Sequence, residues 1–209
     1  YFDMATVRIA SEEVIITRTG FCNELGWEFY LRPEKNAEAV GNRIWKAGQA
    51  HGMILPGTPV FRARRIEAGL MSQAEFDETT TPYDAGLGHF VKIDDRDFIG
   101  KAALETADKR NRTFGMRVRG GIAERGRTMS IDGKIVGQVC SSSWSPFQEC
   151  GVALVRVDDP ATGPGTEVRV LGNDQKIYEA VLCALPMYDA AGDIVRGRVT
   201  DLPSGPDPW

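Results

Sequence analysis

A glutamate beside two aromatic residues ends a glycine-bracketed loop near the start of the chain. The loop runs from Arg18 to Glu28. Trp27 and Phe29 flank the glutamate on either side. A carboxylate can accept two adjacent N–H donors at once while rings pack on a flat ligand, so Glu28 suits a pterin-like heterocycle. The alternative is an ordinary surface glutamate, and an isolated Glu28 fits that interpretation better.

A group of arginines lies on a predicted helix further along the chain. Arg62 and Arg65 are three residues apart and therefore share one helix face. Guanidinium groups recognise carboxylates in bidentate fashion, so this face could hold an anionic tail or a nearby carboxylate. The alternative is a solvated basic face neutralised by Glu67 and Glu75, and the spacing alone favours it.

The turn-rich segment 79–88 also contains a tyrosine and two glycines. It either closes over a pocket or forms an ordered connection. The sequence contains no nucleophile elbow, Walker loop or dinucleotide-binding glycine motif. The aspartate pairs 94–95 and 158–159 lie in turn-like sequence and are expected at the surface.

Hydrophobic spacing predicts the elements that must position these side chains. Short strands are expected around the loop, and two longer helices and a third, shorter one are expected after it. The predicted strands are 5–10, 13–18, 27–31 and 89–93, and the predicted helices begin at residues 34, 58 and 100.

The sequence pattern changes from Thr113 onward. Short strands follow one another at regular spacing there, which predicts a small β-barrel or sandwich. Asp132-Gly133 predicts a hairpin turn within it. The charged run Asp108–Arg112 marks the boundary between two predicted domains, 1–109 and 110–209. The proline-rich tail 203–209 is expected to be irregular. The predicted strands are 113–119, 126–131, 135–141, 151–157, 167–171 and 177–184.

Composition narrows the classes of partner. The net charge of −4 and pI near 5.3 argue against a nucleic-acid partner. No apolar run reaches the roughly 18 residues of a transmembrane helix, so no membrane partner is expected. The four cysteines form no C-x-x-C pair, which argues against a structural zinc site and makes a reducing cytoplasm the expected location. The chain does not begin with Met, and we interpret residue 1 as a cut inside a longer protein.

Taken in order, the motifs of this chain resemble the glycine-cleavage T-protein (aminomethyltransferase) family over nearly all 209 residues. Each motif is weak alone, and their series is specific. The motifs are R-T-G-F (Arg18–Phe21), E-L-G-W-E (Glu24–Glu28), R-I-E-A-G-L (Arg65–Leu70), T-T-P-Y-D-A-G-L-G-H-F-V-K (Thr80–Lys92), D-F-I-G-K-A-A-L (Asp97–Leu104), D-G-K-I-V-G-Q-V (Asp132–Val139) and S-S-S-W-S-P (Ser141–Pro146).

The resemblance implies an α+β fold, in which part of a folate-binding α/β region precedes a small C-terminal β-barrel. It implies tetrahydrofolate as cofactor and one-carbon transfer as activity. Glu28 matches the residue that binds the pterin ring, with Trp27 and Phe21 of the same motif expected at the site. Arg65 matches an arginine at the folate site, and Arg125, or Arg127 as its rival, falls near one at the active-site mouth. The family's catalytic aspartate is expected upstream, so this segment is expected to be inactive alone.

The sequence also departs from the family pattern. The usual G-Y-T-G-E turn reads Gly20–Glu24, G-F-C-N-E, without the tyrosine hydroxyl and one glycine. The one-carbon donor is therefore open between a lipoyl protein and a small molecule such as a methylated amine. Two other interpretations stay open: a non-catalytic folate-binding module, and the folate domain of a flavin-dependent methylamine oxidase or demethylase.

Overall fold

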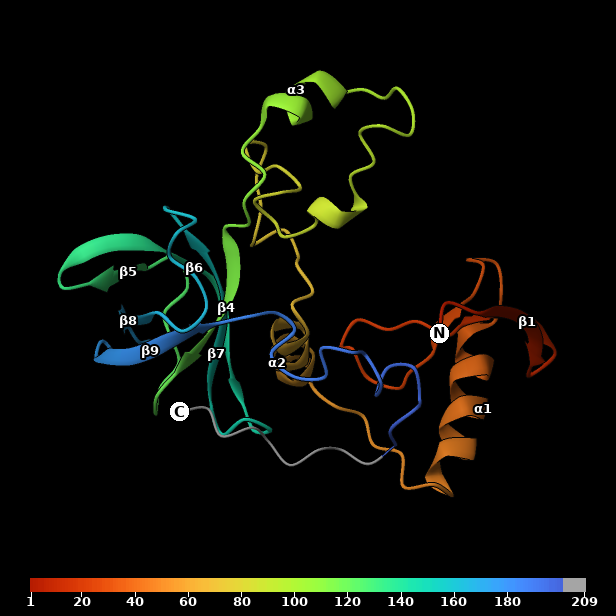
Figure 1. Cartoon of the computed structure of the whole chain (residues 1–209). Coiled ribbons are helices and arrows are strands. Elements are labelled where there is room, and N and C mark those ends of the chain that lie inside the picture. Colours follow the sequence, from red (N-terminus) through yellow and green to blue (C-terminus); the bar gives the residue numbers. More distant parts are fainter. Residues whose placement is uncertain (201–209) are drawn as a thin grey trace. The chain divides into compact units, whose positions relative to one another are not determined.

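The computed structural model describes residues 1–200. Contacts divide these residues into two compact units: residues 1–61 with 191–200, and residues 62–190 (Figure 1). The predicted boundary after residue 109 divides the sequence into two domains, whereas the two units are defined by contacts in the structure. The predicted boundary is therefore not tested by them and stays a prediction. The predicted irregular tail, 203–209, lies outside the described residues.

The first unit contains an antiparallel sheet in the order β1-β2-β3. β1 spans Met4–Ile9, β2 spans Glu12–Thr17 and β3 spans Glu28–Tyr30. Ala10 and Ser11 join the first two strands with positive φ angles of 49° and 69°. Two such residues suit a tight hairpin turn of the I′ type. The structure confirms the first two predicted strands with a shift of one residue, and the third is shorter than predicted.

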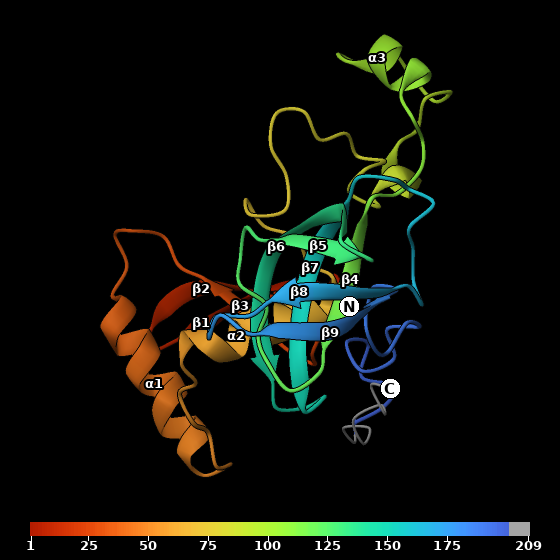
Figure 2. The same cartoon turned by 90° about the vertical axis from the view of Figure 1, so that its left-hand side faces the viewer.

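One face of this sheet is partly buried. Val7 pairs with Val14, and Ile16 pairs with Phe29, so these four apolar side chains point to the same side. The helix α1 (Ala37–Gln49) lies beside β1 in both views (Figure 1 and Figure 2). Val14 and Val40 of α1 are both buried. The opposite face, which carries Glu28, has no buried residue.

Asn36 sets the start of α1. Its side-chain oxygen accepts a hydrogen bond from the Ala39 amide at 3.0 Å, so the helix begins at Ala37 instead of residue 34. Replacing Asn36 by alanine should lower the stability of the helix by about 1 kcal/mol. Amide hydrogen exchange within α1 would measure the change. Asn36→Asp, which keeps a capping oxygen, should preserve the protection; equal loss in both variants would refute the capping role.

The second unit contains a closed six-stranded barrel in the order β4-β7-β6-β5-β8-β9. The structure thus decides between the predicted barrel and sandwich. Asp132 and Gly133 have φ angles of 47° and 80° and form the predicted hairpin turn between β5 and β6. The strands are β4 (Thr113–Val118), β5 (Thr128–Ile131), β6 (Lys134–Ser145), β7 (Cys150–Val157), β8 (Glu167–Leu171) and β9 (Ile177–Cys183).

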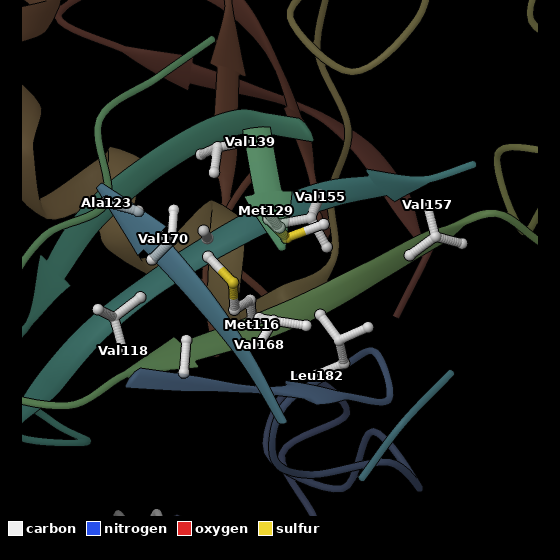
Figure 3. Close-up of a cluster of buried hydrophobic side chains, with 12 residues drawn as sticks. Met116, Val118, Ala123, Met129, Val139, Val155, Val157, Val168, Val170 and Leu182 are labelled. Atoms are coloured by element: carbon white, nitrogen blue, oxygen red, sulfur yellow. The ribbon is translucent and has the colours of Figure 1, made fainter. Parts of the chain in front are cut away.

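Small apolar side chains and methionines fill the barrel. Met116, Met129 and Leu182 are fully or almost fully buried there, among the residues of Figure 3. β7 is buried along nearly its whole length. Its alternate residues, such as Val152 and Leu154, pack with Ile66 of the helix α2 (Thr58–Ala68). A strand covered on both sides needs a continuous apolar run, which β7 has.

The predicted strand over residues 89–93 is wrong. The short 3-10 helix η1 (Gly88–Phe90) begins just before it, and turns follow. The Phe90 amide bonds to the Leu87 carbonyl, and the Val91 amide bonds to that of Gly88, both at 3.0 Å. These local bonds replace a strand partner. The third helix, predicted over residues 100–109, is α3 (Lys101–Thr106), and it ends earlier because Ala107 is extended.

Among residues 1–200 no helix has the length and apolar character that a membrane span requires.

Candidate functional site

Glu28 is held in place by hydroxyl groups on the face of the sheet that has no buried residue. It pairs across the strands with Thr17. Its Oε2 accepts hydrogen bonds from Thr19 Oγ1 and from the Tyr30 hydroxyl, the latter at 3.1 Å. Thr19 Oγ1 also lies 2.6 Å from Thr17 Oγ1. Because Thr19 uses its only proton on Glu28, Thr17 must be the donor of that second bond.

Both fixed hydrogen bonds therefore reach the same oxygen of the Glu28 carboxylate. Within residues 1–200 no hydrogen bond to Oε1 is found. The side chain is half-buried. An oriented carboxylate with one oxygen still able to accept hydrogen bonds can bind a ligand that presents N–H donors.

Arg18 holds the loop that leads to Glu28. Its Nη1 donates to the Gly26 carbonyl at 2.7 Å and its Nη2 to the Val195 carbonyl at 2.9 Å. Its guanidinium carbon lies 4.8 Å from the centre of the Trp27 ring. Trp27 is 55% exposed, and Phe21 is 49% exposed on the same loop. One face of Trp27 thus lies against a cation, which is a stabilising arrangement for the ring.

The segment that supplies Val195 was missed by the sequence analysis, which placed it in the barrel domain. Residues 191–200 belong to the first unit, where Ile194 and Val195 are buried. A Cβ at Gly197 would come within 3.2 Å of Leu25. No spacing pattern in the sequence links two segments that are so far apart.

Arg65, the second predicted binding residue, is buried in an ion-pair network of the second unit. Its Nη1 donates to Glu75 Oε2 at 3.0 Å and to the Leu70 carbonyl at 2.8 Å. Its Nη2 donates to Ser141 Oγ at 3.1 Å. Glu75 also accepts from the Ser72 amide at 2.6 Å. A ligand carboxylate at Arg65 would compete with these partners.

A second buried carboxylate, Glu67 on α2, forms a similar network of its own. Glu67 Oε2 accepts from Arg64 Nη1 at 2.7 Å, and its Oε1 accepts from Ser145 Oγ. The Arg64 guanidinium carbon lies 5.0 Å from the ring centres of both Phe147 and Tyr188. The sequence predicted that Glu67 and Glu75 neutralise these arginines, and the structure confirms it: Glu67 pairs with Arg64 and Glu75 with Arg65. Both glutamates are buried, however, and not solvated as predicted.

The remaining predicted residue, Arg125, lies between β4 and β5 and is exposed. Its charge slightly counters the effect of burial, which raises the pKa of the Cys140 thiol. Its rival Arg127 is bonded to Glu124 at 2.8 Å. Glu28, Trp27 and Phe21 belong to the first unit, and Arg65 and Arg125 to the second. Their common role at a cofactor stays a prediction.

The loop 79–88 borders a hollow in the second unit. Tyr83 is 8% exposed, and Asp84 accepts hydrogen bonds from the amide and hydroxyl of Thr81. The hollow has a volume of about 330 Å³. Its lining is mostly apolar and includes Gly69, Gly86, Leu87, Phe114, Leu185 and Pro186. The sequence left open whether this loop closes over a pocket or is an ordered connection. The structure shows an ordered loop that also lines a hollow.

Three of the four free cysteines are buried: Cys140, Cys150 and Cys183. Burial raises the pKa of the Cys150 thiol and of the Cys183 thiol to about 11 each, and the charge of Arg117 only partly offsets it. Among the described residues no group of histidines, cysteines and carboxylates could hold a metal ion.

Thiol labelling should report this burial. At pH 8 a pKa of about 11 in place of 9 leaves roughly a hundredfold less thiolate, the reactive form. Native Cys150 and Cys183 should therefore react much more slowly with an aromatic disulfide than they do after unfolding. Cys22, which is half-buried, should react first. Mass spectrometry of the labelled peptides would show the order, and early labelling of Cys183 would contradict the buried site.

A small antiparallel sheet with a helix, followed by a closed six-stranded barrel, defines a mixed α+β protein with a C-terminal barrel. Two models of one family match the chain in order. The GCVT N-terminal domain matches residues 1–95, and the glycine cleavage T-protein C-terminal barrel domain matches residues 109–189. The chain belongs to the glycine-cleavage T-protein (aminomethyltransferase) family.

Individual relatives agree with this family. The aminomethyltransferase of Streptomyces coelicolor is 34% identical over 86% of this chain and 50% of its own length. The trimethylamine-oxide aldolase of Ruegeria pomeroyi is 34% identical over 90% of this chain but 25% of its own length. The crystal structure of the Bartonella henselae glycine cleavage system aminomethyltransferase T shares the fold, with a TM-score of 0.68 at 24% identity; the match covers 84% of this chain and 50% of that one. The chain thus spans about half the length of the aminomethyltransferases it matches.

Proposed function

We propose that this chain forms part of a tetrahydrofolate-dependent one-carbon transferase and that Glu28 binds the pterin ring. The observation that carries the proposal is the Glu28 carboxylate, whose Oε2 is held by Thr19 and Tyr30. Membership of the aminomethyltransferase family supports it independently.

The site fits the edge of a pterin. Adjacent N–H donors on that edge can both approach Oε1, because Thr19 and Tyr30 occupy the two lone-pair positions of Oε2 and leave those of Oε1 to a ligand. Thr19 and Tyr30 fix the carboxylate plane before the ligand arrives, which reduces the ordering cost of binding. Tetrahydrofolate, when bound, supplies the amine that accepts the one-carbon unit. The residues of this chain bind and orient it.

Calorimetric titration of tetrahydrofolate into the complete gene product that contains this chain tests the proposal. Saturable binding with a one-to-one ratio is expected. No binding to a protein whose barrel is folded would refute it. Titration of the 209-residue chain alone separately tests the expectation that the segment holds only part of the site.

The hydroxyl of Tyr30 should contribute measurably to affinity. Tyr30→Phe removes one donor to Glu28 but keeps the ring, so tetrahydrofolate binding should weaken by about 0.5–1.5 kcal/mol. Phe29→Leu is the matched control, because Phe29 points to the opposite face of the sheet. The affinity of both variants is measured by the same titration. Equal losses in both would mean that Tyr30 acts only through general stability.

The proposal extends to the catalytic carboxylate and to the one-carbon donor. We place the catalytic aspartate in the part of the relatives that this chain does not span, where it would position the folate amine or assist proton movement. A lipoyl protein is the donor expected for an aminomethyltransferase.

A second candidate is a folate domain of a larger protein that demethylates an amine. The match to the trimethylamine-oxide aldolase, which is about four times as long as the matched region, favours it. Turnover assays of the complete gene product with an aminomethyl-lipoyl protein and with methylated amines would separate the two candidates.

A further inference from the structure

Arg18 joins two segments of the first unit that lie far apart in the sequence. Its backbone is fixed at the end of the sheet, because its amide donates to the Asp3 carbonyl at 2.8 Å and its carbonyl accepts from the Phe2 amide at 3.0 Å. From this fixed position the guanidinium donates to the Gly26 carbonyl at 2.7 Å and to the Val195 carbonyl at 2.9 Å. Hydrogen bonds from a charged donor are roughly twice as strong as neutral ones, so both carbonyls are firmly held.

The first of these carbonyls belongs to the loop that carries the residues proposed to bind the pterin. Residues 18–27 form neither helix nor strand, so no regular ladder of backbone hydrogen bonds fixes their course. Gly26 directly precedes Trp27 and Glu28, and the bond from Arg18 therefore fixes the backbone from which both side chains leave. Trp27 is 55% exposed although one face of its ring lies against Arg18, so the rest of the ring is available to a ligand.

The second carbonyl belongs to residues 191–200, which follow the barrel in sequence but lie in the first unit. Val195 is 3% exposed. Beside it, Arg196 Nη1 donates to the carbonyls of Ala191 and Gly192 at 2.8 and 2.9 Å, which closes the segment on itself. A segment that is buried in part and bonded internally is a firm support for the guanidinium.

We propose that Arg18 is a positioning residue for the pterin site and that residues 191–200 support it. The two bonds hold the loop in the position that presents Trp27 and Glu28, and both Nη groups of Arg18 are used on the protein. A loop that is held before the ligand arrives binds it more tightly, because less conformational freedom is lost on binding. The proposal deepens the proposed function and rests on it for the identity of the ligand.

Arg18→Met in the complete gene product removes both bonds and keeps an unbranched side chain. Without folate, amide hydrogen exchange should quicken severalfold in residues 19–27 and 191–200 together, while exchange in β1 and β2 stays as in the wild type. If the loop then holds its position only about a tenth of the time, the affinity for tetrahydrofolate falls about tenfold. Arg8→Met is the matched control, because Arg8 is an exposed arginine of the same sheet and should change neither measurement.

A double-mutant cycle separates positioning from general stability. In the Glu28→Ala variant the loop no longer has this carboxylate to present, so adding Arg18→Met should lower folate affinity much less than it does in the wild type. An equal loss in both backgrounds would mean that Arg18 contacts the ligand itself or acts through the stability of the whole protein. Either would overturn the positioning role.

Gly197 permits a test that leaves Arg18 in place. It has a φ angle of 69°, and a Cβ there would come within 3.2 Å of Leu25 Cδ1. Gly197→Val should therefore push residues 191–200 away from the loop, and it should quicken exchange and weaken folate binding as Arg18→Met does. Gly52→Val is the matched control, because Gly52 has a φ angle of 71° but no atom within 4 Å of its Cβ position. Equal effects of the two valines would refute the support by residues 191–200.

These outcomes are separable from failure of the proposed function. Normal folate binding by Arg18→Met would reject the positioning role and leave the proposed function standing. Exchange is measured without folate, so joint loosening of both segments in a protein that does not bind tetrahydrofolate would keep the attachment of the loop and reject the ligand. Unchanged exchange in Arg18→Met would reject the attachment itself.

Discussion

Replacing Arg65 by methionine should lower the free energy of unfolding by about 3–5 kcal/mol. Arg65 is 7% exposed and Glu75 is 1% exposed, so the variant leaves a carboxylate buried without its cation. The Leu70 carbonyl and the Ser141 hydroxyl lose a partner as well. Denaturant unfolding followed by near-ultraviolet circular dichroism would measure the loss.

A second substitution separates the unpaired charge from the lost packing. In the double variant Arg65→Met, Glu75→Leu both charges are gone, so much of the stability should return. Arg110→Met is the matched control, because Arg110 pairs with Asp108 in an exposed position. Exposed pairs typically contribute no more than about 1 kcal/mol. If Arg65→Met were as mild as Arg110→Met, the buried network would not stabilise the fold.

Glu28→Ala should weaken tetrahydrofolate binding to the complete protein by about 1.5–3 kcal/mol, a loss of roughly 10- to 150-fold in affinity. The expected loss is large because hydrogen bonds to a charged group are stronger than those between neutral groups. The stability of the ligand-free protein should change little, since Glu28 is half-buried and bonds only to hydroxyl groups. Calorimetry gives the affinity, and thermal unfolding gives the stability.

Two matched variants define what is lost. Glu28→Gln keeps the size of the side chain but replaces one acceptor by a donor, so it should bind almost as poorly as Glu28→Ala. Glu13→Ala removes a carboxylate from the same face, away from the site, and should bind normally. Normal binding by Glu28→Ala would remove Glu28 from the site.

Local signals in the sequence were sufficient for much of the fold. Asp132-Gly133 is a turn because both residues adopt positive φ. Regular spacing of short strands indicated a barrel or sandwich, but closure depends on the pairing of β4 with both β7 and β9, which no local pattern encodes. Residues 89–93 look like a strand because of their apolar side chains. They form none because local turn bonds satisfy the backbone and no neighbouring strand pairs with them.

In the candidate site, too, local features could be predicted from the sequence and contacts between distant residues could not. The loop ending at Glu28 was identifiable from its residues, and the resemblance to the family gave it a role. The hydroxyl groups that orient Glu28 were not singled out, although Thr19 and Tyr30 lie within ten residues of it. A count of donors near a candidate carboxylate would have found them. The contact of Arg18 with Val195 spans 177 positions, and the contact of Arg65 with Ser141 spans 76, so neither could be read from sequence spacing.

The contact between Glu28 and the pterin ring can be measured by removing each partner in turn. Tetrahydrofolate and an analogue without the 2-amino group are titrated into the complete protein and into its Glu28→Ala variant. If Glu28 accepts a hydrogen bond from that amino group, the wild-type protein should lose affinity for the analogue, and the variant should bind the two ligands almost equally. The same loss of affinity for the analogue in both proteins would show that Glu28 does not contact the pterin donor edge.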